Sequence, residues 1–145
     1  MAAPLLRWLR AVLFLGLVYL VTGITFAALA SRAASNPMRM TWRLAAWAIS
    51  GAAFAAHIAY EQVRLRSSPG PTALHASLAV ALGAFALAVA ANVHAQAAAS
   101  HQPSHFLALV LWPVVTALPA FVVGLAAAAG LGLARARGDR TEGRG

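Results

Sequence analysis

Residues 43–66 read RLAAWAISGAAFAAHIAYEQVRLR, an apolar run followed by a polar segment. Its first part is almost entirely apolar, and its second part carries Glu61, the only acidic residue between Met1 and Asp139. An apolar run of about 20 residues is long enough for a helix to cross ~30 Å of hydrocarbon. The stretch therefore predicts a membrane-spanning helix that ends in a polar segment.

The composition of the whole chain also indicates that it lies in a lipid bilayer. Of its 145 residues, 61% are hydrophobic and only 10% are charged. So few charges cannot cover the surface of a soluble domain of this size, whereas a bilayer accepts an apolar exterior. The chain has no cysteine, which excludes disulfides and thiolate chemistry. The net charge of +8 comes from arginines at the flanks of apolar segments, which favours membrane topology and argues against nucleic-acid binding.

Four apolar segments divide the chain, and we expect each to form a transmembrane helix. They cover residues 8–30, 41–63, 72–96 and 104–133. Short sequences rich in serine, proline and glycine separate them and predict turns. The predicted fold is all-α, an antiparallel bundle of four transmembrane helices in one domain, 1–134. A basic, glycine-containing tail over 135–145 is expected to be disordered.

The arginines predict the orientation of this bundle. The first apolar segment resembles a signal peptide, but it is longer than the usual ~7–15-residue apolar core, so we expect it to be retained as a helix. Four spans then place both termini on one side, and the positive-inside rule makes that side cytoplasmic. Alanine-rich, lysine-free usage is associated with GC-rich bacterial genes, so the bacterial inner membrane is the expected location. The arginines of the termini side are Arg7, Arg10, Arg64, Arg66, Arg135, Arg137, Arg140 and Arg144, against Arg32, Arg39 and Arg43 on the other side.

The second segment carries its distinctive residues on one face. Their spacing alternates between four and three, as on one stripe of a helix in a left-handed bundle. Polar groups that face lipid are costly, so we expect this stripe to face the bundle interior. The stripe consists of Arg43, Trp47, Ser50, Phe54, His57, Glu61 and Arg64.

Small residues repeat every four positions in the third and fourth segments. Such repeats let helix backbones approach closely, either within one chain or between copies of it. In an alanine-rich chain we expect the intramolecular role. The residues are Ala79, Gly83, Gly124, Ala128 and Gly132.

The first candidate site surrounds Glu61. His57 lies four residues before Glu61 and Arg64 three residues after it, so all three share one helical face, with Tyr60 adjacent. A carboxylate paired with a cation at the membrane boundary is the simplest structural interpretation. A proton relay is the functional alternative, because a partly buried carboxylate and an imidazole can exchange protons near neutral pH.

The histidines suggest a second candidate site, a b-type haem. Antiparallel helices bring His57 level with His75, and His94 level with His105, as axial ligands from facing helices would be. Against haem, His75 and His94 are 19 residues apart, which rotates them by about 100° and separates them by about 28 Å along a straight helix. Both pairs would also lie at the membrane edges.

The third candidate is a metal site formed by His94, His101 and His105. Imidazoles suit zinc or copper. Pro103 lies between two of the histidines, however, and no carboxylate or thiolate is close in sequence to complete the ligands. Solvated loop histidines are the default expectation.

The sequence favours a non-enzymatic protein. It contains no phosphate-binding loop, serine elbow or HExxH motif, and the predicted loops are short. We expect an accessory or structural subunit that lies in the lipid bilayer, packs against a membrane-protein partner or a second copy, and needs no cofactor. The alternatives are a small proton or solute transporter that uses the His57–Glu61 seam, and a haem-binding electron carrier. The sequence identifies no substrate, partner or oligomeric state.

Overall fold

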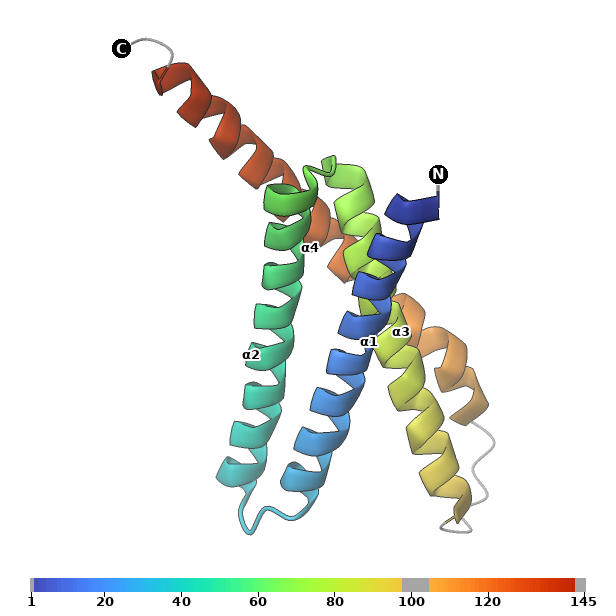
Figure 1. Cartoon of the computed structure of the whole chain (residues 1–145). Helices are drawn as coiled ribbons and strands as arrows, with labels where there is room; N and C mark the ends of the chain where they lie inside the picture. Colours follow the sequence, from blue (N-terminus) through green and yellow to red (C-terminus); the bar gives the residue numbers. More distant parts are fainter. Residues whose placement is uncertain (1, 98–104, 143–145) are drawn as a thin grey trace.

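The computed structural model describes residues 2–97 and 105–142, and these form four antiparallel helices (Figure 1). Every regular element within these two ranges is helical, which confirms the all-α class and the four predicted helices. The elements are α1 (Ala2–Ser31), α2 (Asn36–Tyr60), the π-helical turn η1 (Glu61–Leu65), α3 (Pro69–Ala97) and α4 (His105–Glu142).

Three of the helices are long and apolar enough to cross a membrane, as expected for a membrane protein. The spans within them are Leu6–Ser31, Pro69–Gln96 and Leu107–Arg135. Helix α2 has the length to cross a bilayer, but its arginines near one end and its polar groups near the other lower its hydropathy.

The fourth helix is longer than predicted. It continues through Glu142, so residues 135–142 are helical where the sequence predicted a disordered tail. Alanine and arginine are strong helix formers, and Ala134 to Arg137 can extend a helix that has already formed in the apolar segment. Residues 143–145 lie outside the described residues.

Helix α2 begins and ends with defined local signals. At its start, Ser35 Oγ accepts a hydrogen bond from the backbone N–H of Met38 at 3.4 Å, and Pro37 occupies the first turn. At the other end, the backbone N–H groups of Arg66 and Ser67 both reach back to the carbonyl of Glu61. Arg66 has a left-handed backbone conformation, with φ of 51°, which ends the helix and turns the chain into α3.

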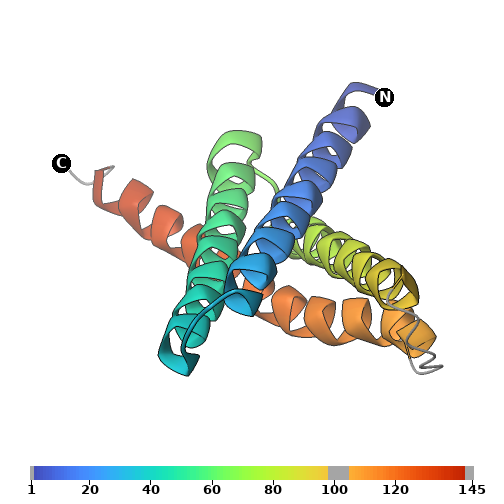
Figure 2. The same cartoon turned by 90° about the horizontal axis from the view of Figure 1, so that it is seen from below.

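Helix α3 is the centre of the fold because it packs against both α1 and α4. Its buried residues are mostly alanines, and small side chains allow neighbouring helices to approach closely. Helix α4 lies along α3 and crosses α2 obliquely, as the view from below shows (Figure 2). The described core consists of two clusters: Val12, Leu15, Tyr19 and Ala79 between α1 and α3, and Ile58, Ala76 and Ala128 between α2, α3 and α4.

The predicted small residues of α3 serve packing within the chain. Ala79 is fully buried against α1. At Gly83, an added Cβ would lie only 2.6 Å from Cβ of Tyr19, so α1 and α3 approach too closely there for any side chain.

The small residues of α4 divide into two groups. A Cβ at Gly124 would meet Ala73 and Phe54, and Ala128 is fully buried. Both therefore lie in the interface with α2 and α3. Gly132 has no heavy atom within 4 Å of an added Cβ, so it takes no part in packing among the described residues.

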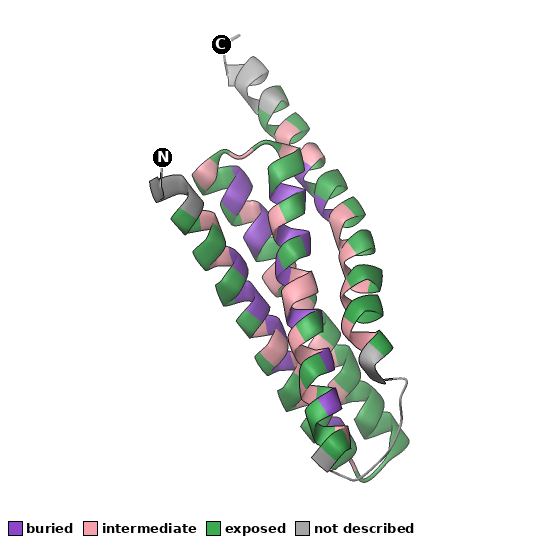
Figure 3. Cartoon of the chain, turned by 90° about the vertical axis from the view of Figure 1, so that its right-hand side faces the viewer, coloured by how far each residue is buried: buried purple, intermediate pink, exposed green. Residues whose placement is uncertain are grey.

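The two ends of the bundle differ in how closely the helices meet. We call the end that contains Glu61 and the first residue of α3 the Glu61 end, and the end that contains the α1–α2 connection the Arg39 end. Buried residues concentrate towards the Glu61 end (Figure 3). The cluster that α2 shares with α3 and α4 begins only at Phe54, because α2 touches those helices sparingly elsewhere.

The predicted inward stripe of α2 is consequently buried only in its second half. His57 and Glu61 are buried as expected. Arg43 is exposed, and Trp47 is 79% exposed, because no part of α3 or α4 covers α2 at that level. Arg64 is also exposed, beyond the point where the α-helix changes to a π-helical turn.

Candidate functional site: a buried carboxylate between two histidines

The side chain of Glu61 is fully buried, although it is a carboxylate in an apolar protein. It is the first residue of η1, so it leaves α2 at the point where α2, α3 and α4 converge. A buried carboxylate is stable only when nearby groups form hydrogen bonds with it or share its charge. The surroundings of Glu61 therefore define the site.

Two imidazoles from different helices face the Glu61 carboxylate. Nδ1 of His75, on α3, lies 2.9 Å from Oε1 and 3.2 Å from Oε2 of Glu61. Nε2 of His57, on α2, lies 3.4 Å from the same Oε1 atom. With Glu61 ionised, the carboxylate can only accept hydrogen bonds, so Nδ1 of His75 carries the hydrogen that it donates. The three side chains form a His57–Glu61–His75 cluster.

The contact of His57 differs from that of His75. Although Nε2 of His57 is close to Glu61, it is buried and has no hydrogen-bond partner among the described residues. The side chain is almost inaccessible, at 2% exposure. A buried polar nitrogen without a partner loses its hydration, so the cluster keeps an unused capacity for one hydrogen bond.

Helix α1 contributes an aromatic wall to the cluster. The indole of Trp8 stacks on the imidazole of His75 with ring centroids 4.8 Å apart and an interplanar angle of 3°. Stacking fixes the plane of the imidazole and shields one of its faces. Trp8 thereby helps to hold Nδ1 of His75 towards Glu61.

A second layer of hydrogen bonds closes the turn between α2 and α3. The Gln62 side-chain amide donates to the carbonyl of Ser67 at 3.0 Å and to Oγ1 of Thr72 at 2.9 Å. Thr72 Oγ1 in turn donates to the carbonyl of Ser68 at 3.2 Å. These bonds pair the polar groups of the turn, so Glu61 is held by an ordered backbone.

Helix α4 contributes an arginine side chain that binds a backbone carbonyl of the site. The Arg135 guanidinium donates to the Gln62 carbonyl at 2.6 Å. In a regular α-helix that carbonyl would accept from the N–H of residue 66, but Arg66 reaches back to Glu61 instead. The π-helical turn thus frees an acceptor for α4, and all four helices meet at the Glu61 end.

The sequence predicted the contact between two of the three residues of the cluster. His57 and Glu61 are in contact as their spacing predicts, whereas Tyr60 is 50% exposed and Arg64 makes no ion pair with Glu61 among the described residues. A π-helical turn takes more residues than an α-helical turn, so Arg64 no longer shares the face of Glu61. No pattern in the sequence predicts the contacts of Trp8, Gln62 and Arg135.

The predicted haem ligands His57, on α2, and His75, on α3, lie at the same level of the bundle, but both contact Glu61. Its carboxylate occupies the contact between His57 and His75, and His75 presents Nδ1 to it. At the other end, His94 is exposed on α3. His101 and the side chain of His105 lie outside the described residues, so the pairing of His94 with His105 and the His94, His101, His105 metal cluster stay predictions.

The groups of the cluster can form hydrogen bonds and bind protons. Within residues 2–97 and 105–142, no three histidine, cysteine or acidic side chains are arranged as ligands of one metal ion. A carboxylate flanked by two imidazoles can hold a shared proton in several positions. Comparison of the chain with protein-family models, curated proteins and solved structures gives no match.

Proposed function

We propose that this chain is a four-span protein of the bacterial inner membrane, with cytoplasmic termini, that acts as a non-enzymatic subunit. In this proposal α2 is the fourth span and packs against a transmembrane helix of a partner protein or of a second copy. The three apolar helices support insertion into a bilayer, and the excess of arginines at the Glu61 end supports the orientation.

The observation that carries the proposal is the outer face of α2. Five small residues on α2 are exposed over two turns, and an added Cβ at Gly51 would meet no heavy atom within 4 Å. These residues form what we call the α2 small-residue face: Ala48, Gly51, Ala52, Ala55 and Ala56.

In this proposal the first half of α4 faces lipid and serves as the comparison for α2. The exposed residues of α4 between positions 107 and 123 are mostly large and apolar, including Val114, Leu118 and Val122. Large apolar side chains make extensive contact with lipid chains. Contact with lipid therefore does not explain a face of alanine and glycine. Small residues instead allow two helix backbones to approach, so the contrast between α2 and α4 favours a helix as the occupant of the α2 small-residue face.

Cysteine crosslinking in native membranes tests this proposal directly, because the chain has no cysteine of its own. We expect Ala52→Cys to form a crosslinked adduct with a short bis-maleimide, and Val122→Cys on α4 to form none. The mass of the adduct distinguishes a second copy from a different partner. Equal crosslinking at both positions, or none at Ala52→Cys, would contradict the proposal.

A size substitution provides the second test. We expect Ala52→Leu to dissociate the complex in native mass spectrometry, whereas Val122→Leu leaves it intact. Both side chains are exposed in the single chain, so neither change disturbs its own packing. Retention of the complex in Ala52→Leu would show that α2 is not the interface.

The His57–Glu61–His75 cluster supports a second candidate function, proton-coupled transport. The specific observation is that the only carboxylate of the apolar body is fully buried between two imidazoles, one of which has an unused hydrogen-bonding nitrogen. Intramembrane carboxylates of this kind commonly mark proton pathways.

Flux measurements in liposomes distinguish this candidate from a structural role. Proton transport predicts that Glu61→Gln abolishes a pH-driven flux, while Arg64→Gln, on the exposed side of the same turn, retains it. The helical content of both variants must match that of the wild type. No flux in the wild-type protein would leave Glu61 with a structural role only.

A further inference from the structure

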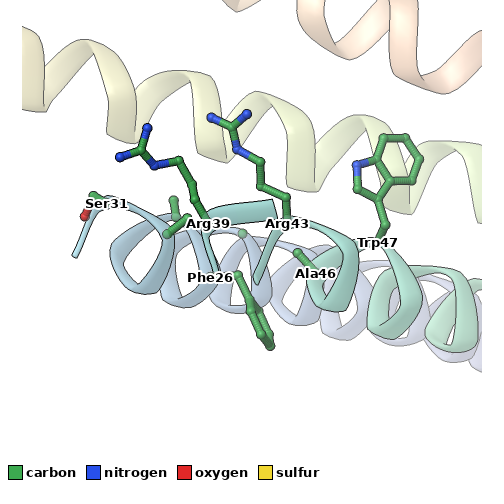
Figure 4. A pocket seen from close by; sticks show the side chains of 9 residues that line it. Phe26, Ser31, Arg39, Arg43, Ala46 and Trp47 are labelled. Carbon is green, nitrogen blue, oxygen red and sulfur yellow. The ribbon is translucent and has the colours of Figure 1, made fainter. Parts of the chain in front are cut away.

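A groove lies between α1 and α2 at the Arg39 end, away from the His57–Glu61–His75 cluster (Figure 4). It has a volume of about 520 Å³, which is large enough for part of a lipid molecule. Its floor and walls are mostly apolar and its rim is cationic. The lining residues are Gly23, Phe26, Ala27, Ala30, Ser31, Arg39, Arg43, Ala46 and Trp47.

The rim of the groove is formed by Arg39 and Arg43, one turn apart on α2. Their side chains extend to the same side of the helix (Figure 4). Neither guanidinium makes an ion pair with any residue that the structure describes, and the chain has no acidic residue before Glu61, which lies at the opposite end. The N-terminus of α2 at Asn36 adds positive potential to the same region.

The walls of the groove suit an acyl chain. Helix α1 supplies Ala27 and Ala30, and α2 supplies Ala46, so the surface is smooth and without hydrogen-bonding side chains along this part. Trp47 stands beside these residues and is 79% exposed within the single chain. An indole at such a position packs well against the glycerol and upper acyl region of a lipid.

We propose that this groove binds an anionic phospholipid, with the headgroup phosphate between Arg39 and Arg43 and one acyl chain along α1 and α2 beside Trp47. A phosphodiester accepts several hydrogen bonds from guanidinium groups, and two unpaired arginines one turn apart can both reach it. An amphiphile is favoured over a small anion because the cationic rim is continuous with an apolar wall. The groove is distinct from the α2 small-residue face, so the lipid site does not depend on the proposed subunit interface.

Native mass spectrometry of the full chain in detergent provides the test, with phosphatidylglycerol and phosphatidylcholine as the probes. We expect phosphatidylglycerol to bind at least about tenfold more tightly than phosphatidylcholine. The Arg39→Gln/Arg43→Gln double variant should lose at least about tenfold in phosphatidylglycerol affinity, because both guanidinium groups that donate to the phosphate are removed. The matched control is Arg7→Gln/Arg10→Gln, two exposed arginines of α1 at the other end, which should change the affinity less than twofold.

The apolar part of the site is tested separately. Ala27 is exposed and lines the groove, so Ala27→Phe should fill it without disturbing the helix packing, and should weaken phosphatidylglycerol binding several-fold. Glycerophosphoglycerol, the headgroup without acyl chains, should fail to compete. Three results would each overturn the proposal: unchanged affinity in the double variant, equal binding of phosphatidylcholine, or full competition by the free headgroup. Circular dichroism confirms that each variant retains its helices.

Discussion

The charged side chains at the two ends of this bundle differ in whether they have partners within the chain. At the Glu61 end, a buried carboxylate meets two imidazoles, and a guanidinium donates to a backbone carbonyl. At the Arg39 end, two arginines lie on the rim of an open groove without an ion pair among the described residues. Polar groups therefore hold the helices together where the helices converge. Where the helices separate, polar groups remain available to other molecules.

The same contrast appears in the side chains that fill the space. Where α3 packs against its neighbours, the helices meet through alanines and a tightly enclosed glycine, Gly83, so there is little room for change. On the exposed side of α2, Trp47 is largely exposed and Gly51 has open space. Substitutions of the same type should therefore have different effects in these two regions.

The largest effect is expected from Glu61→Ala. Removal of the carboxylate takes the shared partner from the buried His57 and the partly exposed His75, and the lost hydrogen bond of His75 costs about 1.5–3 kcal/mol in addition to the cavity left behind. The free energy of unfolding, measured by detergent-denaturant titration with circular dichroism, should fall accordingly. An unchanged midpoint would show that the cluster does not hold the Glu61 end together.

A matched pair of glycines should give the next largest effect. In Gly83→Ala the new Cβ would lie 2.6 Å from Cβ of Tyr19, so α1 and α3 must move apart, at a cost of about 1–3 kcal/mol. In Gly51→Ala the methyl group enters open space, and the higher helix propensity of alanine should stabilise the helix by about 0.5–1 kcal/mol. The two midpoints should shift in opposite directions in the same titration, and a shift in the same direction would contradict the packing.

A smaller difference is expected between two tryptophans. Trp8→Leu removes the stack on His75, which contributes about 0.5–1.5 kcal/mol beyond the apolar contact. Trp42→Leu removes a looser tilted contact with Phe26, with ring centroids 6.0 Å apart, at the Arg39 end. The unfolding midpoint should fall further for Trp8→Leu. If Trp42→Leu were the more damaging variant, the Arg39 end would be the better-packed one.

The smallest effect is expected from Arg39→Gln/Arg43→Gln in lipid-free detergent. Both side chains are exposed and make no ion pair among the described residues, so the midpoint should stay at the wild-type value. Addition of phosphatidylglycerol should raise the midpoint of the wild type but not of the double variant, because a ligand stabilises only the state that binds it. A fall in the lipid-free midpoint would show that the arginines have a structural role.

The helices were predictable because apolar length is a strong signal. Residues 8–30, 72–96 and 105–133 of the predicted segments lie within α-helices, and 41–63 runs through α2 into η1, whereas residue 104 lies outside the described residues. The α-helix of the second segment gives way to η1 at Glu61, and nothing in that sequence marks the change. The fourth helix exceeded its prediction because Ala134 to Arg137 are strong helix formers, a property that hydropathy does not register.

The candidate site was predictable only in part. The spacing of His57 and Glu61 gave their contact, and the depth of His75 opposite them was visible from the short turn before α3. The pairing of His75 with Glu61 was not predicted, because the sequence does not show that η1 rotates Arg64 away from the face of Glu61. The stacking of Trp8 depends on the packing of α1 against α3, which no local pattern in the sequence specifies.

The bond from Arg135 to the Gln62 carbonyl affects how this fold can change in evolution. The acceptor is a backbone atom, so the bond requires the π-helical turn but no particular side chain at position 62. The side chain at position 62 is restricted by its bonds to Ser67 and Thr72, and a substitution there needs no compensating change in α4. Among related sequences, the link between η1 and α4 would appear as a retained arginine without a co-varying partner, and methods that infer contacts from paired substitutions would overlook it.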